Sequence, residues 1–205
     1  MKIAVIGAGN VGKALGKAWT RRGHDVSYGV RQPGDAKYDG LKTASVPEAA
    51  RAAEAILLAT PWEATAAALT AAGDLAGKLL LDATNPLTIG PQGMGLAVGH
   101  TTSGGEQVAG WAKNAVVFKT LNSTGFSNME DAGGYAQKPV MFFAGDDTAK
   151  RATVAALVAD LGFEPVDAGP LGNARLLEPY AMLWIDLAVK RGQGRDIAFA
   201  LMQRK

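Results

Sequence analysis

The chain has 205 residues, of which 48% are hydrophobic, and its 21 basic and 19 acidic residues leave a formal net charge of +2. This balance gives no reason to expect a nucleic-acid partner or an anionic membrane surface. Because cysteine is absent, disulfides, thiolate zinc sites, iron–sulfur clusters and a cysteine nucleophile are excluded. No stretch approaches the roughly 20 apolar residues of a membrane span, and the apolar run before the first glycine is too short for a secretory signal. We therefore expect a cytoplasmic protein with no membrane partner.

Short apolar runs alternate along the chain with stretches of helical pattern. Strands are predicted at residues 2–6, 25–30, 55–60, 78–83, 115–120, 140–144 and 163–168, and helices at residues 10–22, 47–53, 63–72, 106–113, 147–161 and 171–191. Several of the strand segments are apolar without interruption, which is typical of parallel strands covered on both faces. The alternation predicts an α/β fold with a doubly wound, mostly parallel sheet of the Rossmann type.

Local signals support this division. Gly23 and Gly162 stand where two of the helices should end, and Asp147 is placed to cap another helix at its start. Residues 84–105 contain six glycines and are expected to form a long irregular loop, which in a compact domain is usually functional or mobile. Residues 1–170 are expected to form a nucleotide-binding domain, with a small helical extension, residues 171–205, packed on it.

The first predicted strand is followed by the sequence GAGNVG and then by a helix, which is the context that a dinucleotide-binding fingerprint requires. Gly7 permits a tight turn, Gly9 lets a pyrophosphate approach the main chain, and Gly12 lets the helix lie close to the strand. The free N–H groups at the start of the helix favour an anion. We expect a dinucleotide here, without excluding that these glycines form an ordinary turn.

The end of the second predicted strand indicates which dinucleotide is bound. NAD-binding proteins carry a carboxylate at this point for the ribose 2′-hydroxyl, whereas this chain has Arg31 and no acidic residue from Ser27 to Gln32. A guanidinium suits a 2′-phosphate, because it forms paired, charge-assisted hydrogen bonds. The sequence therefore favours NADP(H) over NAD(H), and Lys37 is a candidate for a second positive charge.

Polar groups also follow three later strands, at the edge of the sheet where ligands of such folds bind. The candidates for contact with ribose or nicotinamide are Thr60, Pro61, Trp62, Asn85, Pro86 and Asn122. Plain turn formation and covering of the sheet are the alternative roles of these residues.

No pair of residues stands out as an acid–base dyad. His24 is expected at the surface, and His100 lies in the glycine-rich loop as a weak catalytic candidate. Ser103 and Asp82 leave a Ser–His–Asp arrangement open by residue type, although no G-x-S-x-G nucleophile elbow is present. Two distant histidines do not predict a metal site. A carbonyl acceptor would need a proton donor, for which His100 or Tyr180 would be the first candidates.

Seven segments spread over nearly the whole chain occur in the order found in a known family. They are IGAGNVGKALGKAW, LLATPWEAT, LLDATNPL, SGGEQVAGW, VVFKTLNSTGF, FFAGDD and LGFEPVDAGPLGNARLLEPYAMLWI. With these motifs the chain resembles the NADP oxidoreductases that depend on coenzyme F420, a deazaflavin. It is also similar to the reductase domain of membrane ferric reductases.

The resemblance implies roles for residues matched motif by motif. Gly7, Gly9, Asn10 and Val11 would line the phosphates, and Arg31 would bind the 2′-phosphate. Thr60, Pro61 and Trp62 would border the ribose and nicotinamide, with Asn85, Pro86 and Asn122 farther along. Trp62 and the C-terminal helix would border the acceptor ring.

The expected activity is hydride transfer between NADPH and a small-molecule electron acceptor, either F420 or a flavin-like ring. Such a step depends on orientation more than on a strong acid or base. A non-catalytic NADP(H)-binding redox sensor, or an NADPH-dependent ferric or quinone reductase, is the alternative. The apolar C-terminal segment and the resemblance both favour a homodimer.

Overall fold

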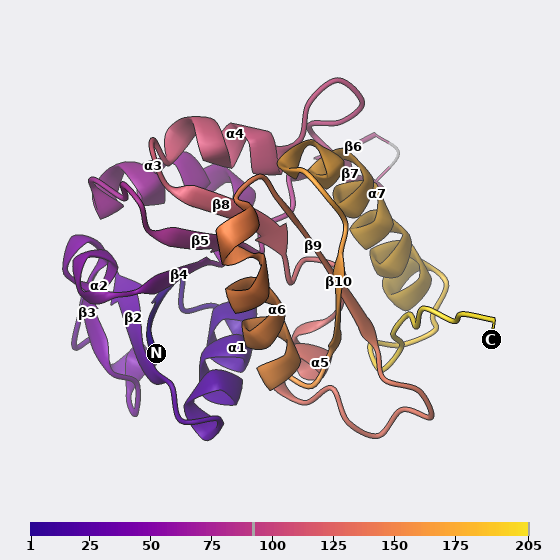
Figure 1. Ribbon diagram of the computed structural model, residues 1–205, viewed down its shortest axis with the longest axis horizontal. Helices are drawn as coiled ribbons and strands as arrows, with labels where there is room; N and C mark the ends of the chain where they lie inside the picture. The colour runs from indigo at the N-terminus through magenta and orange to yellow at the C-terminus, as the bar shows by residue number, and fades with distance from the viewer. Residues whose placement is uncertain (92, 205) are drawn as a thin grey trace.

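The computed structural model describes residues 1–91 and 93–204 as a sheet with helices on both faces (Figure 1). The eight-stranded sheet has the order β10-β9-β8-β5-β4-β1-β2-β3. Its strands are β1 (Lys2–Ile6), β2 (Asp25–Val30), β3 (Thr43–Ser45), β4 (Ala55–Leu58), β5 (Leu79–Asp82), β8 (Val116–Thr120), β9 (Val140–Gly145) and β10 (Glu164–Asp167). Adjacent strands are parallel except β8 and β9, which are antiparallel. The predicted Rossmann-type, mostly parallel α/β sheet is confirmed.

The helices follow the strands as the alternating pattern predicts. They are α1 (Asn10–Arg21), α2 (Val46–Ala52), α3 (Trp62–Ala72), α4 (Gly104–Trp111), α5 (Phe126–Glu130), α6 (Arg151–Asp160) and α7 (Ala174–Ile185). Gly23 and Gly162, just beyond α1 and α6, both have positive φ angles, as expected of residues that end helices. The Asp147 carboxylate accepts a hydrogen bond from the Lys150 N–H and caps the 3₁₀ turn before α6.

The uninterrupted apolar strands are explained by two hydrophobic cores, one on each face of the sheet. In β1, Ile3 and Val5 belong to the core that contains residues of α1 and α6, whereas Ala4 and Ile6 belong to the core under α2, α3 and α4. Since successive side chains of a strand point to opposite faces, a strand covered on both faces must be apolar at every position.

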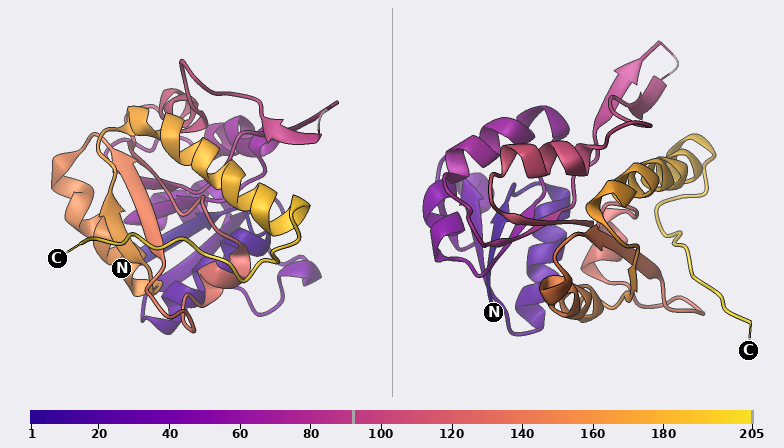
Figure 2. Two further views of the ribbon diagram at one scale, coloured as in Figure 1. Left: turned by 90° about the vertical axis from the view of Figure 1, so that its right-hand side faces the viewer. Right: turned by 45° about the horizontal axis from the view of Figure 1, so that its top comes forward.

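One prediction of secondary structure is wrong, and two short elements were not predicted. Residues 84–105, expected as an irregular loop, contain the antiparallel hairpin β6 (Leu87–Gly90) and β7 (Gly93–Leu96), which projects from the body of the molecule (Figure 2). Leu87 and Leu96, and Ile89 and Met94, pair across the hairpin on one face, but each strand has only four residues and three of the eight are glycine, a composition that predicts a loop. The short elements β3 and α5 were not expected. The helix predicted over residues 171–191 is confirmed in extent, since a 3₁₀ turn, α7 and a π turn at Asp186–Lys190 follow one another without a break. Pro179 lies inside α7.

The C-terminal tail lies against β9, α5 and α7. The Ile197 carbonyl accepts hydrogen bonds from Trp184 Nε1 at 2.7 Å and from Asn128 Nδ2 at 2.9 Å, and the Phe199 carbonyl accepts one from the Val140 N–H. Residues 195–199 are thereby tied to the edge of the main body. Within the described part of the chain, no helix has the length and apolar character needed to cross a membrane.

The contact between α1 and α6 generates a stability prediction. Trp19 is fully buried, and its indole N–H donates to the Leu157 carbonyl at 2.9 Å. Trp19→Phe removes this donor and leaves a void, so we expect urea denaturation followed by circular dichroism to show a loss of about 2–4 kcal/mol. Trp111→Phe, at a 39% exposed position, is the matched control and should change the free energy of unfolding by less than about 0.5 kcal/mol. Equal losses in the two variants would contradict the prediction.

Candidate functional site

The turn between β1 and α1 is shaped by the close approach of main-chain segments. Gly7 has a φ of +106°, and a Cβ there would lie 2.5 Å from the Ala59 carbonyl oxygen at the end of β4. A Cβ on Gly12 would lie 1.9 Å from the Gly7 carbonyl oxygen. Neither position can accept a side chain without moving the main chain. At Gly9, by contrast, a Cβ would meet nothing within 4 Å, so this part of the turn faces open space.

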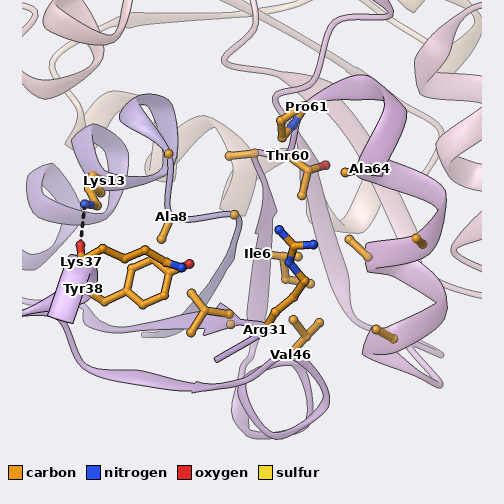
Figure 3. Close-up of a pocket in the computed structure, with 18 residues that line it drawn as sticks. Ile6, Ala8, Lys13, Arg31, Lys37, Tyr38, Val46, Thr60, Pro61 and Ala64 are labelled. Atoms are coloured by element: carbon orange, nitrogen blue, oxygen red, sulfur yellow. Dashed lines mark hydrogen bonds between the residues drawn. The ribbon is translucent and has the colours of Figure 1, made fainter. Parts of the chain in front are cut away.

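A cavity of about 480 Å³ opens beside this turn, between the ends of β1, β2 and β4 and the helix α3 (Figure 3). This volume is within the range of small-ligand sites. Most lining groups are main chain or small apolar side chains, and the polar ones gather at the turn and at the end of β2. The lining residues are Ile6, Gly7, Ala8, Gly9, Lys13, Gly29, Val30, Arg31, Lys37, Tyr38, Val46, Ala59, Thr60, Pro61, Ala64, Ala67, Ala68 and Ala71.

One wall of the cavity consists of alanines that the sequence analysis did not single out. Ala64, Ala67, Ala68 and Ala71 lie on one face of α3, because residues three, four and seven apart are neighbours on a helix. Their methyl groups leave room for a flat ring against Val46 on the opposite side. The signal was present in the sequence as an alanine-rich helix directly after a strand end, but the size of the space depends on how far α3 lies from α2.

Three cations stand around the cavity. Lys37 is paired with Asp35, with 2.7 Å between Lys37 Nζ and Asp35 Oδ2; this hydrogen bond lowers the pKa of Asp35 and raises the pKa of Lys37. Lys13 donates to the Lys37 carbonyl at 3.3 Å. The exposed Arg31 side chain points into the cavity (Figure 3), and its guanidinium forms no hydrogen bond or ion pair with residues 1–91 or 93–204. An unpaired guanidinium at a cavity wall is a ready partner for an anion.

The structure brings together part of the predicted site. Gly7, Gly9, Arg31, Lys37, Thr60 and Pro61 all line the cavity. Asn10, Val11 and Gly12 are not among its lining residues: Asn10 and Val11 begin α1, and Gly12 is buried against the turn. Trp62 lies outside it too, and its ring packs at a tilt against Trp111 of α4 with the ring centroids 5.3 Å apart.

The candidates from the later strands form a second group. The amide of Asn85 donates to the Asn122 carbonyl at 2.8 Å, and the amide of Asn122 donates to Asn85 Oδ1 at 3.0 Å. Pro86 follows directly and lies beside Gly104 at the start of α4. The two asparagines therefore bridge the ends of β5 and β8, as expected of groups at the same edge of the sheet.

The structure contradicts a Ser–His–Asp arrangement. The Ser103 hydroxyl caps α4, accepting from the Glu106 N–H and donating to the Glu106 carboxylate, whereas Asp82 is paired with the buried Lys119 at 3.0 Å. His100 is exposed and lines a separate cavity between residues 95–100 and α7. Within residues 1–91 and 93–204, no group of three or more His, Asp or Glu side chains could hold a metal ion.

Tyr180, the second candidate proton donor, lies apart from the cavity beside the turn. Its ring packs edge-on against Phe142 at 5.5 Å and lies 4.8 Å from the Phe199 ring. Burial raises the pKa of Tyr180 to about 12, so the phenol keeps its proton at neutral pH. Its surroundings are those of a packing residue that joins α7 to the C-terminal tail.

These features together fit a dinucleotide. The main chain of Gly9 is open to the cavity, and the start of α1 carries no side-chain cap. Arg31 places a guanidinium at the cavity wall, and no carboxylate of the described residues is paired with it. A pyrophosphate matches the first two groups and a phosphorylated ribose matches the third. The fold and the cavity are those of a Rossmann-type dinucleotide-binding domain.

Comparisons with known proteins agree with this class. Residues 2–86 match the family described as NADP oxidoreductase, coenzyme F420-dependent. A crystal structure of a candidate F420-dependent NADP reductase from Arthrobacter sp. FB24 is 34% identical, with a TM-score of 0.90, and the alignment covers 99% of this chain and 100% of that one. The chain belongs to this family of NADP-dependent oxidoreductases.

Two further relatives are more distant. Metalloreductase STEAP3 of Rattus norvegicus is 27% identical over 182 residues, which are 86% of this chain but 36% of the relative, so the chain spans about a third of its length. A reductive aminase from Aspergillus terreus, solved with NADPH and ethyl levulinate, is 21% identical with a TM-score of 0.68, covering 93% of this chain and 62% of that one. This last likeness concerns the fold alone.

The glycines of the turn generate a prediction about stability. Gly7→Ala forces a side chain into a left-handed conformation against the Ala59 carbonyl, and we expect a loss of about 2 kcal/mol or more in urea denaturation. Gly9→Ala should leave stability within about 0.5 kcal/mol of the parent, because its φ of −78° suits any residue and its Cβ meets nothing. A Gly9→Ala variant as unstable as Gly7→Ala would show that Gly9 has a structural role.

Proposed function

We propose that this protein binds NADPH with its adenosine half in the cavity beside α1 and transfers hydride to a deazaflavin or flavin-like acceptor. The observation that carries the proposal is the unpaired Arg31 guanidinium at the wall of a cavity whose other end is the Gly9 turn. A 2′-phosphate would satisfy the guanidinium with paired hydrogen bonds. Family membership supports the same choice of cofactor.

In this proposal each part of the cavity holds one part of the nucleotide. The N–H groups at the start of α1 bind the pyrophosphate above Gly9. Arg31 binds the 2′-phosphate, with Lys37 released from Asp35 as a second cation and Lys13 as a third. The alanine face of α3 and Val46 enclose the adenine ring between them. Arg31 and Lys37, which the sequence predicts as cofactor-binding residues, thus act together with Lys13.

The reacting end would lie farther along the sheet edge. Thr60 and Pro61 lie at the wall of the cavity, and Asn85 and Asn122 lie at the ends of β5 and β8. Asn122 is buried and its amide nitrogen donates to Asn85 and to the Leu177 carbonyl, so the half-buried Asn85 is the member of the pair that would meet a carboxamide or ribose hydroxyl. When bound, the reduced nicotinamide supplies a hydride from its C4 carbon. The task of these side chains is to orient that ring and exclude alternative poses, because hydride transfer needs the reacting atoms about 3–3.5 Å apart and aligned.

The acceptor class is supported by the relatives. A crystal structure described as a candidate F420-dependent NADP reductase is 34% identical over nearly the whole chain. A deazaflavin or flavin ring accepts hydride directly and takes its proton from solvent, so it needs no acid–base pair in the protein. This likeness favours a deazaflavin or flavin over a carbonyl or imine. The likeness to a metalloreductase supports a second candidate, in which a flavin accepts the hydride and passes electrons on to ferric iron.

Arg31 provides the test of cofactor choice. For Arg31→Glu we expect isothermal titration calorimetry to show NADPH affinity reduced about 10- to 100-fold, since a charge-assisted pair is lost and a repulsion is added. NADH, which lacks the 2′-phosphate, should be affected far less. Arg51→Glu, on the exposed side of α2, carries the same change of charge away from the cavity and should leave both affinities unchanged. Unaltered NADPH binding by Arg31→Glu would remove the role given to this residue.

The acceptor is tested by turnover. Purified protein is mixed with NADPH and, separately, with F420, FMN, FAD, a soluble quinone or a ferric chelate, and the absorbance of NADPH at 340 nm is followed. We expect turnover with F420 or a flavin. Turnover with the ferric chelate only in the presence of flavin would favour the second candidate. Tight NADPH binding without turnover on any acceptor would favour a redox sensor instead.

A further inference from the structure

A fully buried lysine stands in the middle of the sheet. Lys119 belongs to β8, and its ammonium lies 3.0 Å from Asp82 Oδ2 of β5 and 3.0 Å from Glu178 Oε1 of α7. The exposed fractions of the Lys119 and Asp82 side chains are 0% and that of Glu178 is 1%. Desolvating three charged groups is costly, and an ion cluster of this kind is weak evidence for stability alone. Stability alone therefore does not explain why these three charged groups are buried together.

The remaining hydrogen bonds of the cluster join four separate elements. Glu178 accepts from the N–H groups of Gly104 and Gly105, both at 2.9 Å, which form the first turn of α4. Asp82 accepts from the Thr84 N–H at 2.9 Å, and Lys119 donates to the Thr84 carbonyl. The cluster therefore connects β5, β8, α4 and α7 at a single point below the sheet edge.

A second link runs beside the cluster and joins the same segments. Asn122 donates to Asn85 Oδ1 at 3.0 Å and to the Leu177 carbonyl at 3.2 Å. Lys119 binds Thr84 and Glu178, and Asn122 binds Asn85 and Leu177. Thr84 directly precedes Asn85 in the chain, and Leu177 directly precedes Glu178, so the two links hold adjacent residues at both of their ends. Because each link fixes the backbone next to the other, the position of the amide pair, in which Asn122 is buried and Asn85 is half-buried, depends on the buried ions.

We propose that Lys119 is a positioning residue for the nicotinamide half of the cofactor, acting through Asn85, Asn122 and α7. This inference rests on the proposed function, which gives the two amides to that half. If Lys119 loses its ammonium, Asp82 and Glu178 are left as facing carboxylates without a cation between them, and α7 no longer has a fixed distance from the end of β5. The cavity beside α1 shares no residue with this cluster, so the adenosine half is left intact.

The test uses two nucleotides that differ in the half under study. 2′,5′-ADP occupies only the adenosine half, whereas NADP⁺ occupies both. Both dissociation constants are measured by calorimetry for the parent, for Lys119→Met and for Glu178→Gln, with the melting temperature recorded for each. Glu178→Gln removes a charge while keeping the size of the side chain. If Lys119→Met does not fold, Glu178→Gln still tests the inference.

We expect 2′,5′-ADP affinity to stay within about twofold in the variants and NADP⁺ affinity to fall about tenfold, the lower end of the losses seen when a group that orients a ligand-binding residue is removed. The fluorescence of bound NADPH should shift toward that of free NADPH, because its ring is no longer held. Loss of stability alone would weaken both nucleotides together and leave the fluorescence of the bound ring unchanged.

The control is the surface ion pair that joins the same two helices. Arg175 of α7 donates to both carboxylate oxygens of Glu106 of α4, at 2.8 and 2.6 Å. Glu106→Gln should leave the affinity for both nucleotides unchanged. An equal effect of Glu106→Gln, or parallel losses for both nucleotides in the buried variants, would overturn the inference. If the parent itself binds neither nucleotide, the proposed function fails and this inference with it. If the parent binds both and the buried variants match it, only the inference fails.

Discussion

The close contact between the main chains of Gly7, Gly12 and Ala59 is the constraint on which the rest of the site depends. With the Gly7 carbonyl only 1.9 Å from where a Cβ of Gly12 would stand, α1 begins immediately at the end of β1 and directs its first N–H groups along the sheet edge. The same contact draws the turn against the end of β4. The cavity beside Gly9 is what remains between this turn and the helix that follows β4.

The two ends of the proposed cofactor site are built by different means. The adenosine end uses features that belong to consecutive segments of the chain: a turn after β1, a cation after β2 and a helix face after β4. The other end depends on contacts between segments far apart in the sequence, above all the links from Asp82 and Asn85 through β8 to α7.

Charge is placed differently at the two ends. Around the cavity the cations are exposed or half-exposed, and Arg31 has no partner among the described residues, so it is available to a ligand. Beneath the amide pair the ions are buried and fully paired with one another. An exposed, unpaired cation is suited to binding an anion that arrives from solvent, whereas a buried, paired cluster is suited to holding elements in place.

Local sequence patterns predicted the features that depend on residues close together in the chain. The uninterrupted apolar runs predicted a sheet covered on both faces, the spacing of Gly7, Gly9 and Gly12 predicted the turn, and Arg31 at a strand end predicted the cation at the cavity. The hairpin formed by β6 and β7 escaped prediction because its strands have four residues each and are rich in glycine, which is the composition of a loop. Trp62, expected beside the ribose, packs at a tilt against Trp111 instead, a contact that arises only when α3 and α4 lie side by side.

The sequence by itself determined the class of fold, the turn and the charge beside it, because each depends on residues close together in the chain and on simple rules of burial and backbone conformation. Only the tertiary structure decided which face of α3 lines the cavity and how Lys119 is used. A lysine within an apolar strand is anomalous in the sequence, yet its partners lie 37 and 59 positions away, on β5 and α7. Which charges meet there is set by the packing of four elements, and no local pattern contains that information.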